Sequence, residues 1–275
     1  SGKDNVAICG YHGWHDWYLA ANHNSEDKLS KHLLSGLSVS GVPKNLKNST
    51  FPFNYNNYDE LLSIVSNNDI GVIKMEVERN YGPEDNFLHK VRNLANEKGI
   101  VLIFDECTSG FRETYGGIHK KYAVEPDLAM YGKTLGNGYA ITAVVGKKSV
   151  MEAAQNTFIS STFWTERIGP TAALKSLEVM KRIESWKIIT SKGILVQKKW
   201  KHLSDNHNLP ITVSGLPAIT TYSFDSENAL KYKTFITQEM LKKGFLASTH
   251  FYASISHTNQ VISSYFTALD EVFKI

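Results

Sequence analysis

The spacing of apolar residues first predicts a strand–helix–strand unit over residues 70–104. The run IGVIKME (70–76) is short and apolar, as in a buried strand. In PEDNFLHKVRNLANEKG (83–99), apolar residues recur at helical spacing, acidic residues stand near the start and a glycine supplies a stop. The run IVLIF (100–104) is apolar without alternation, which is typical of a parallel strand covered on both faces. Together these segments predict a βαβ unit with a right-handed crossover.

Two further strands are expected downstream, and charged residues stand where strands end. DLAMYG (127–132) is one candidate, and AITAVVG (140–146) is another that follows a GNG turn. Asp105 follows the apolar run of one strand, and Lys133 directly follows the next. Ligands of open α/β sheets bind beyond the carboxyl ends of the strands. We therefore expect Asp105 and Lys133 to share one edge of the sheet.

Beyond Gly169 the pattern changes to that of a second, smaller domain. Helices are predicted over 169–184, about 188–203, 229–243 and from about 259, and strands over 211–215 (ITVSG), 218–224 (AITTYSF) and 245–249 (FLAST). This order is typical of a small α+β domain. The expected organisation is an α/β large domain with a mostly parallel sheet over residues 1–184, followed by a small C-terminal α+β domain over residues 185–275.

Composition narrows the class of partners. The chain has 275 residues, 42% of them hydrophobic and 21% charged, and a formal net charge of +3, so nucleic acid and membrane are not expected as partners. Two cysteines, Cys9 and Cys107, make no disulfide framework, which favours a reducing, cytoplasmic setting. No apolar run has the roughly 18 residues of a transmembrane helix, and no signal peptide is recognised. The start SGKDNVAICGYHGW lacks a Met, and we expect an N-terminal part of a longer protein to precede it.

Three kinds of chemistry compete for MYGKTLGNG. A phosphate-binding P-loop matches at Gly132, Lys133 and Thr134, but its first glycine would fall on Asp127. A dinucleotide fingerprint fails because Ile141 stands where its third glycine belongs. The third hypothesis is a lysine that forms a Schiff base with pyridoxal 5′-phosphate (PLP).

The Schiff-base hypothesis explains why an acid and a lysine should share an edge. PLP withdraws electrons best while its ring nitrogen is protonated, and a carboxylate held against that nitrogen keeps the proton there. Asp105 would be that acid and Lys133 the amine. Taken by themselves, the residues also allow a strand-end cap at Asp105 and a solvated turn lysine at Lys133.

A metal site is the less favoured reading of the histidines. His12 and His15 have H-x-x-H spacing, but no carboxylate or cysteine completes a ligand set, so no metal is expected.

The segment VLIFDECTSGFRETYGGIHKKYAVEPDLAMYGKTLGNGYAITAVVG resembles the class III PLP-dependent aminotransferases. Within that family, SGKDNVAICGYHGWHD and EMLKKGFLAST…SISHT are most similar to glutamate-1-semialdehyde 2,1-aminomutases. The resemblance spans almost the whole chain. It implies a fold-type I PLP-dependent transferase, an enzyme of amino-group transfer with small amino and keto substrates, and a homodimer with a shared active site.

The resemblance also implies the roles of single residues. Lys133 matches the lysine of the internal aldimine, and Asp105 matches the acid that pairs with the pyridine nitrogen. Cys107 stands where the family usually has the Val that packs on one ring face, and a thiol is similar in size.

Further positions of the cofactor site follow from the same resemblance. Tyr11 matches the aromatic residue on the other ring face, and His12 and Gly13 complete its loop. Glu76 matches the glutamate of the family's EP pair, with Val77 replacing the proline. Thr162 matches the threonine that reaches the cofactor phosphate of the partner subunit.

Departures from the family pattern leave alternatives open. The family's phosphate loop lies upstream of its TGRD segment, to which SGKD at the start of this chain corresponds, so the loop would precede this chain. The family's SGNP is WTER here, near the expected substrate position. A mutase and an aminotransferase are therefore both possible, as are an aminotransferase on a sugar or cell-surface precursor and a non-catalytic fragment or subunit.

Overall fold

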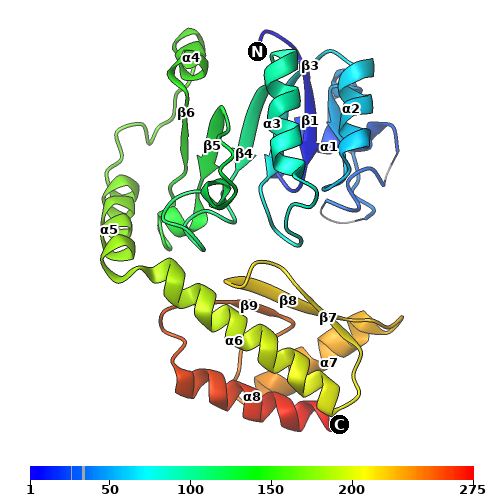
Figure 1. The fold of residues 1–275 in the computed structure, drawn as a ribbon, viewed down its shortest axis with the longest axis vertical. Coiled ribbons are helices and arrows are strands. Elements are labelled where there is room, and N and C mark those ends of the chain that lie inside the picture. Colours follow the sequence, from blue (N-terminus) through cyan, green and yellow to red (C-terminus); the bar gives the residue numbers. More distant parts are fainter. Residues whose placement is uncertain (26, 33–34) are drawn as a thin grey trace. The chain divides into compact units, whose positions relative to one another are not determined.

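The chain folds into two compact units. The computed structural model describes residues 1–25, 27–32 and 35–275 (Figure 1). Unit 1 comprises residues 1–78, 82–110 and 116–176, and unit 2 comprises residues 79–81, 111–115 and 177–275. The expected boundary between residues 184 and 185 stays a prediction.

Unit 1 is built on a six-stranded sheet in the order β2-β1-β3-β4-β5-β6 (Figure 1). Its strands are β1 (Asn5–Cys9), β2 (Thr50–Pro52), β3 (Ile70–Glu76), β4 (Val101–Asp105), β5 (Leu128–Tyr131) and β6 (Ala143–Gly146). Neighbours pair in parallel from β2 through β5, and β6 pairs antiparallel with β5. The mostly parallel α/β sheet is therefore confirmed.

Helices and short 3₁₀ turns connect these strands. The helices are α1 (Asp16–Leu19), α2 (Tyr58–Asn67), α3 (Phe87–Lys98), α4 (Lys148–Met151) and α5 (Ile168–Ile183), the last of which runs from unit 1 into unit 2. The 3₁₀ turns are η1 (Ala20–His23), η2 (Lys44–Leu46), η3 (Ile118–Tyr122), η4 (Lys133–Leu135) and η5 (Glu152–Asn156). In Figure 1, α2 and α3 lie side by side on the same face of the sheet.

The predicted strand–helix–strand unit is confirmed as β3, α3 and β4. The apolar stripe of α3 is buried, and the helix ends at Gly99, whose φ of 64° is left-handed, as helix-terminating glycines often are. β3 and β4 are parallel neighbours, with Glu76 opposite Asp105. The carboxyl ends of β1, β3, β4 and β5 therefore lie along one edge, called here the carboxyl edge of the sheet.

Unit 2 packs helices against a three-stranded antiparallel sheet, β7-β8-β9. Its strands are β7 (Ile211–Ser214), β8 (Ile219–Phe224) and β9 (His250–Tyr252), and its helices are α6 (Ser185–Asn206), α7 (Ala229–Lys242) and α8 (Asn259–Phe273). Buried side chains of α6, β8, α7 and α8 form one hydrophobic cluster, and Trp200 within it is fully buried. The expected small α+β architecture is confirmed.

One predicted strand of unit 2 is displaced. The sequence FLAST (245–249) was expected to form the third strand, but the strand is β9, which begins at His250. The reason lies at the end of α7. The Phe245 amide donates to the Met240 carbonyl at 2.9 Å, so this residue closes the helix end and does not pair with β8.

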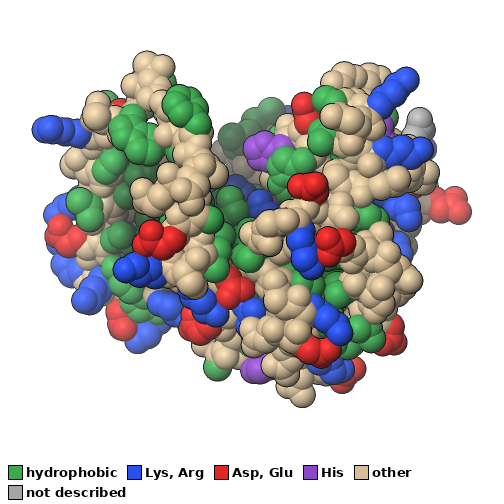
Figure 2. Space-filling model, turned by 90° about the horizontal axis from the view of Figure 1, so that it is seen from above, with side chains coloured by type: hydrophobic (Ala, Val, Ile, Leu, Met, Phe, Trp, Pro, Cys, Tyr) green, Lys and Arg blue, Asp and Glu red, His purple; other side chains and the backbone are tan. Residues whose placement is uncertain are grey.

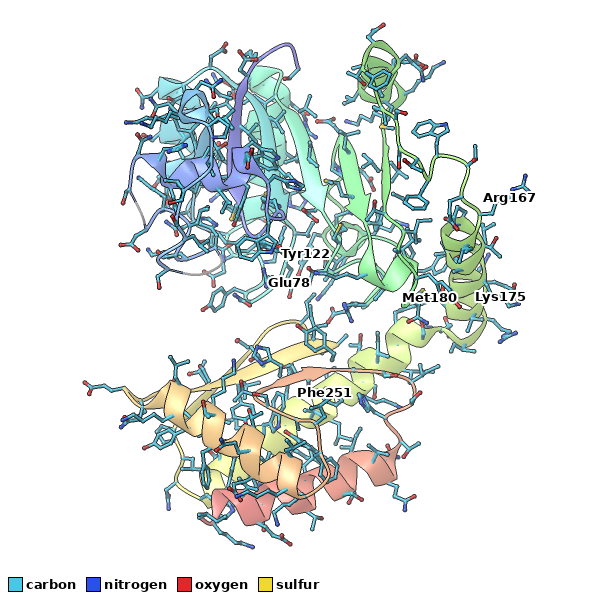
Figure 3. All side chains as sticks on the ribbon, turned by 180° about the vertical axis from the view of Figure 1, so that it is seen from behind. Glu78, Tyr122, Arg167, Lys175, Met180 and Phe251 are labelled. Atoms are coloured by element: carbon cyan, nitrogen blue, oxygen red, sulfur yellow. The ribbon has the colours of Figure 1, made fainter. Side chains whose placement is uncertain are left out.

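The surface shows no large block of one charge in the view of Figure 2, where basic and acidic side chains are interspersed. None of the helices in the described residues is long and apolar enough to span a membrane. Figure 3 shows Glu78 beside Tyr122, whose hydroxyl donates to the Glu78 carboxylate and ties the chain beyond β3 to η3.

Candidate active site

Asp105 is the last residue of β4 and is only 7% exposed. Its Oδ2 lies 3.0 Å from Nδ1 of His12 and 3.4 Å from Nζ of Lys74. Its Oδ1 accepts a hydrogen bond from the Cys107 amide at 3.2 Å. The strand end thus presents a buried carboxylate held by an imidazole, an ammonium group and a backbone amide.

These partners keep Asp105 ionised. Burial would raise the pKa of this carboxyl, but the hydrogen bond and charge of His12, then the charge of Lys74 and the Cys107 amide, outweigh it. The net effect lowers the pKa of Asp105 from 3.8 to about 2. At neutral pH the group is therefore a carboxylate and can accept a proton-bearing ring nitrogen.

The loop after β1 brings Tyr11 and His12 to this carboxylate. Gly10 has φ +107°, and a Cβ there would lie 2.5 Å from Oε2 of Glu76. Because a side chain is absent, that carboxylate can approach and accept a hydrogen bond from the Tyr11 amide at 3.1 Å. Tyr18 fixes the same turn by donating to the Gly10 carbonyl at 3.0 Å.

Lys133 begins the turn after β5 and has a left-handed backbone with φ +44°. Few residues other than glycine adopt this region, and strained residues of this kind cluster at functional sites. Its Nζ donates to Oγ1 of Thr108 at 2.7 Å, and the side chain is exposed. Thr134 donates to the Gly110 carbonyl at 2.7 Å, so the turns after β4 and β5 are joined twice.

Cys107 lies between the acid and the lysine turn. A Cβ on Gly132, the residue before Lys133, would be 3.4 Å from Sγ of Cys107. Burial and then the Asp105 carboxylate raise the pKa of the Cys107 thiol to about 11, against a smaller lowering by Lys133 and Lys74. The group is therefore a thiol at neutral pH and not a nucleophile.

The predicted site residues fall into four sets. His12, Asp105 and Cys107 are in direct contact. The Tyr11 amide donates a hydrogen bond to the carboxylate of Glu76 at the end of β3. Lys133 is tied to Thr108, the residue after Cys107. The other two predicted residues are less engaged: Gly13 has φ +95° in the Tyr11 loop, and Thr162 is exposed beyond η5.

Sequence reasoning missed Lys74. The one sequence signal for it is a charged residue inside the apolar run IGVIKME, because a buried lysine needs a partner that neutralises its charge. Lys74 and Glu76 are two residues apart on β3, so both side chains project from the same face of the sheet as Asp105.

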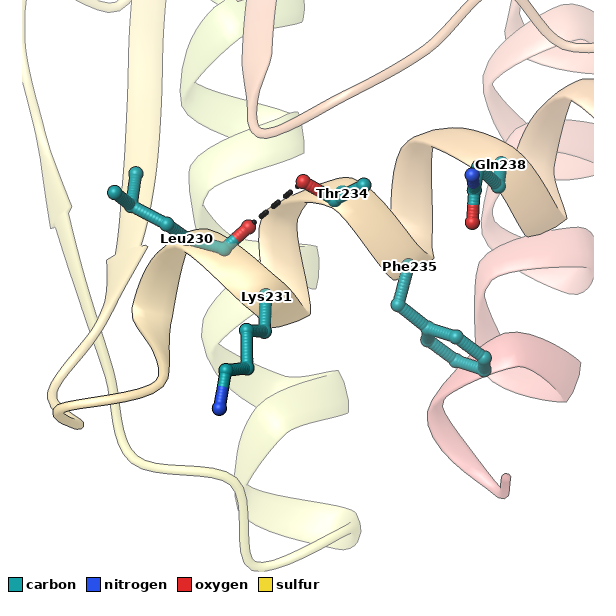
Figure 4. Close-up of a pocket in the computed structure, with 5 residues that line it drawn as sticks. All are labelled: Leu230, Lys231, Thr234, Phe235 and Gln238. Carbon is teal, nitrogen blue, oxygen red and sulfur yellow. Dashed lines mark hydrogen bonds between the residues drawn. The ribbon is translucent and has the colours of Figure 1, made fainter.

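Two other kinds of site are relevant within the described residues, a metal centre and a surface groove. The described residues include no group of three or more His, Cys, Asp or Glu side chains placed to hold a metal ion. A shallow groove on α7 in unit 2 (Figure 4) contains none of the predicted site residues; it is lined by Leu230, Lys231, Thr234, Phe235 and Gln238.

Comparison with known proteins identifies the family to which this chain belongs. The model of the family Aminotransferase class-III matches residues 10–264. The chain belongs to the class III aminotransferases. This confirms the fold expectation and agrees with pyridoxal 5′-phosphate as the expected cofactor.

Individual relatives are distant. A 3-aminobutyryl-CoA aminotransferase of Cloacimonas acidaminovorans (strain Evry) is 31% identical over 98% of this chain and 65% of its own length. A glutamate-1-semialdehyde 2,1-aminomutase of Methanococcus maripaludis (strain C7 / ATCC BAA-1331) is 28% identical over 96% of this chain and 66% of its own length. The chain therefore spans about two thirds of these relatives.

Solved structures agree on the fold. The PLP internal aldimine form of FumI from Sphingopyxis sp. MTA144 has a TM-score of 0.86 at 20% identity and matches 99% of this chain and 65% of its own. An omega-transaminase from Sphaerobacter thermophilus also has a TM-score of 0.86, at 19% identity, over 99% of this chain and 68% of its own.

Proposed function

We propose that this chain is a PLP-dependent enzyme of amino-group transfer, in which Lys133 holds the cofactor covalently through its amine and Asp105 faces the ring nitrogen. The observation that carries the proposal is the carboxyl edge itself. A buried, ionised carboxylate ends β4, and a conformationally strained lysine follows the adjacent strand β5.

The residues at the carboxyl edge fit the chemistry of this cofactor. Asp105 supplies a negative charge for a protonated pyridine nitrogen, and Tyr11 and Cys107 supply an aromatic and a small apolar surface for the two ring faces. When bound, PLP withdraws electrons from the carbon next to the substrate amine. The protein must then hold the ring proton and move the substrate proton.

Lys133 is the residue proposed to move that proton. Its amine donates to the Thr108 hydroxyl at 2.7 Å, which orients it above the turn after β4. With its amine free, Lys133 would take a proton from the substrate carbon as a general base and return it as a general acid.

Two reactions of this class are supported by relatives. One relative is named an aminotransferase for 3-aminobutyryl-CoA, and others are named glutamate-1-semialdehyde 2,1-aminomutases. We favour an aminotransferase or a glutamate-1-semialdehyde aminomutase, which differ in whether a second substrate accepts the amine. The segment WTER, in place of SGNP, also leaves room for a sugar or other cell-surface precursor as substrate.

One assay separates these reactions. The 275-residue chain, loaded with PLP, is given glutamate 1-semialdehyde without an acceptor, and in parallel 3-aminobutyryl-CoA or an amino sugar with 2-oxoglutarate. Turnover without acceptor identifies a mutase, and glutamate formed from 2-oxoglutarate identifies an aminotransferase. Tight PLP retention in equilibrium dialysis with no turnover of any pair would favour a non-catalytic subunit.

We also propose a homodimer with a shared active site. Its support is the stretch around Thr162, where large apolar side chains are exposed: Phe158 at 98%, Phe163 at 75% and Trp164 at 68%. Exposed apolar surface of this kind marks interaction sites. A second copy that covers it would bring Thr162 to the cofactor phosphate of its partner.

A further inference from the structure

Lys74 is a lysine inside a strand of the sheet, and its burial is unusual for an ammonium group. The residue is 8% exposed and stands in the middle of β3. Lysine is almost never buried without a partner. Its Nζ lies 3.4 Å from Oδ2 of Asp105 and 5.4 Å from the centroid of the Trp17 ring.

Both contacts are of the kind that a lysine ammonium group makes. The carboxylate neutralises the ammonium group, and the indole face attracts a cation. Trp17 is itself held in place, because its carbonyl accepts a hydrogen bond from the Thr50 hydroxyl at 2.6 Å. The position of the Lys74 side chain is therefore set by strand β3 and by Trp17.

Lys74 and His12 contact the same oxygen of the Asp105 carboxylate. Oδ2 of Asp105 contacts both the His12 imidazole and the Lys74 ammonium group, while Oδ1 accepts a hydrogen bond from the Cys107 amide. A carboxylate that already shares its charge with a cation holds an additional proton-bearing group less strongly. The ring nitrogen of a bound cofactor would be such a group.

We propose that Lys74 is a positioning residue that shares the Asp105 carboxylate with the ring nitrogen of the cofactor and so weakens the hold of Asp105 on the ring proton. This inference rests on the proposed function. It deepens that function by assigning a residue that sets how strongly the site draws electrons from the substrate.

The other charged groups around Asp105 come from each neighbouring element. His12 comes from the loop after β1, and Glu76 is the register partner on β3. Cys107 follows Asp105 at the end of β4, and the positive charge of Lys133 lowers the pKa of the Cys107 thiol against the larger effect of burial. The register partner on β5 is Met130, which carries no charge. Of the lysines in this set, only Lys74 is paired directly with the carboxylate in the part of the chain described.

The test uses the full chain loaded with PLP labelled with ¹⁵N in the ring, and follows the ring-nitrogen signal against pH. Lys74→Met and Lys74→Gln remove the charge, Lys74→Arg keeps it, and Lys147→Met is the matched control. Lys147 forms its own ion pair with Asp127 at 2.7 Å, away from Asp105. The glutamine variant keeps a donor for Asp105 if the methionine variant does not fold.

The two neutral variants should hold the ring proton to a pH about one unit or more above that of the wild type, the scale of shift that a close charge produces. Lys74→Arg and Lys147→Met should follow the wild type. If the wild type binds PLP on Lys133 but the neutral variants titrate like it, the inference is wrong and the proposed function stands. If the wild type forms no adduct on Lys133, both fail.

Discussion

Single side chains decide whether the carboxyl end of β4 can serve a cofactor. Asp105 was predicted from its place after an apolar run, and its role in pairing with a ring nitrogen stays a prediction. Its partner Lys74 was not predicted, because a charged residue within an apolar strand gives no hint of which neighbour it will meet. That contact depends on the register of β3 against β4, which pattern analysis does not supply.

Asp105 should make the fold sensitive to acid. The pKa of this carboxyl is lowered from 3.8 to about 2, so its contribution to stability is complete above about pH 4 and is lost as pH falls toward 2. The wild type should lose about 2 kcal/mol of unfolding free energy over that range that Asp105→Asn does not lose. Urea unfolding at pH 5, 4, 3 and 2 measures the difference.

Asp4→Asn serves as the control for this titration, because Asp4 is exposed near the start of the chain. It should show the same acid-induced loss as the wild type. An Asp105→Asn variant whose stability fell with acid as steeply as that of the wild type would show that Asp105 does not cause the acid sensitivity.

Gly10 is the second residue that can be tested singly. Gly10→Ala places a methyl group where Glu76 Oε2 would be 2.5 Å away, at φ +107°. Gly138→Ala meets nothing within 4 Å at nearly the same φ of +108°. Both variants share the cost of the left-handed backbone, so their difference isolates the clash.

We expect Gly10→Ala to be less stable than Gly138→Ala by about 1–3 kcal/mol, the usual cost of overpacking. It should also weaken PLP binding, because the Glu76 bond to the Tyr11 amide is displaced. Chemical denaturation and PLP titration give the two quantities. Equal stabilities of the two variants would mean that the loop after β1 yields to the methyl group.

Strands and helices place these side chains, and the sequence predicts some of these elements better than others. β3, α3 and β4 were predicted because long apolar periodicity is a strong signal. β1, β2 and α2 were not, since NVAIC is only five residues and TFP three. The helix end after α7 shifted the last strand to His250, because the cap at Phe245 uses an amide that the pattern assigned to the sheet.

Asp127 holds β4, α3 and the end of β6 in one arrangement. Its carboxylate accepts from the Leu102 amide at 2.8 Å, Arg92 at 2.9 Å and Lys147 at 2.7 Å. Asp127→Ala should cost about 2–4 kcal/mol, because the buried Leu102 amide and the largely buried Arg92 guanidinium lose their acceptor. It should also weaken PLP binding, since β5 follows Asp127 directly and leads into the turn that begins with Lys133.

An exposed pair of the same kind provides the comparison. Asp69 pairs with Lys3 at 2.8 Å and has 75% of its side chain exposed, so Asp69→Ala should cost less than about 1 kcal/mol. Thermal and urea unfolding rank the two variants. A similar cost for both would show that Asp127 does not organise these elements.

The molecule as a whole belongs to the class III aminotransferases, and the stretch around Thr162 bears on its assembly. Light scattering on the purified chain should give the mass of a dimer. The double variant Phe163→Ser/Trp164→Ser should give a monomer, because these side chains are 75% and 68% exposed in one copy.

Leu246→Ser is the matched apolar control, since Leu246 is 96% exposed on unit 2. It should leave the mass unchanged. If the double variant has the same mass as the wild type, the proposed shared active site loses its structural support.

The most direct test of the central claim asks which amine binds the cofactor. The chain is mixed with PLP and reduced with borohydride, which converts the imine between cofactor and lysine into a stable secondary amine, and the labelled peptide is then mapped by mass spectrometry. We expect a single adduct on Lys133 that disappears in Lys133→Ala, with Lys74 unlabelled. An adduct that persists in Lys133→Ala, or that maps to Lys74 in the wild type, would contradict this claim.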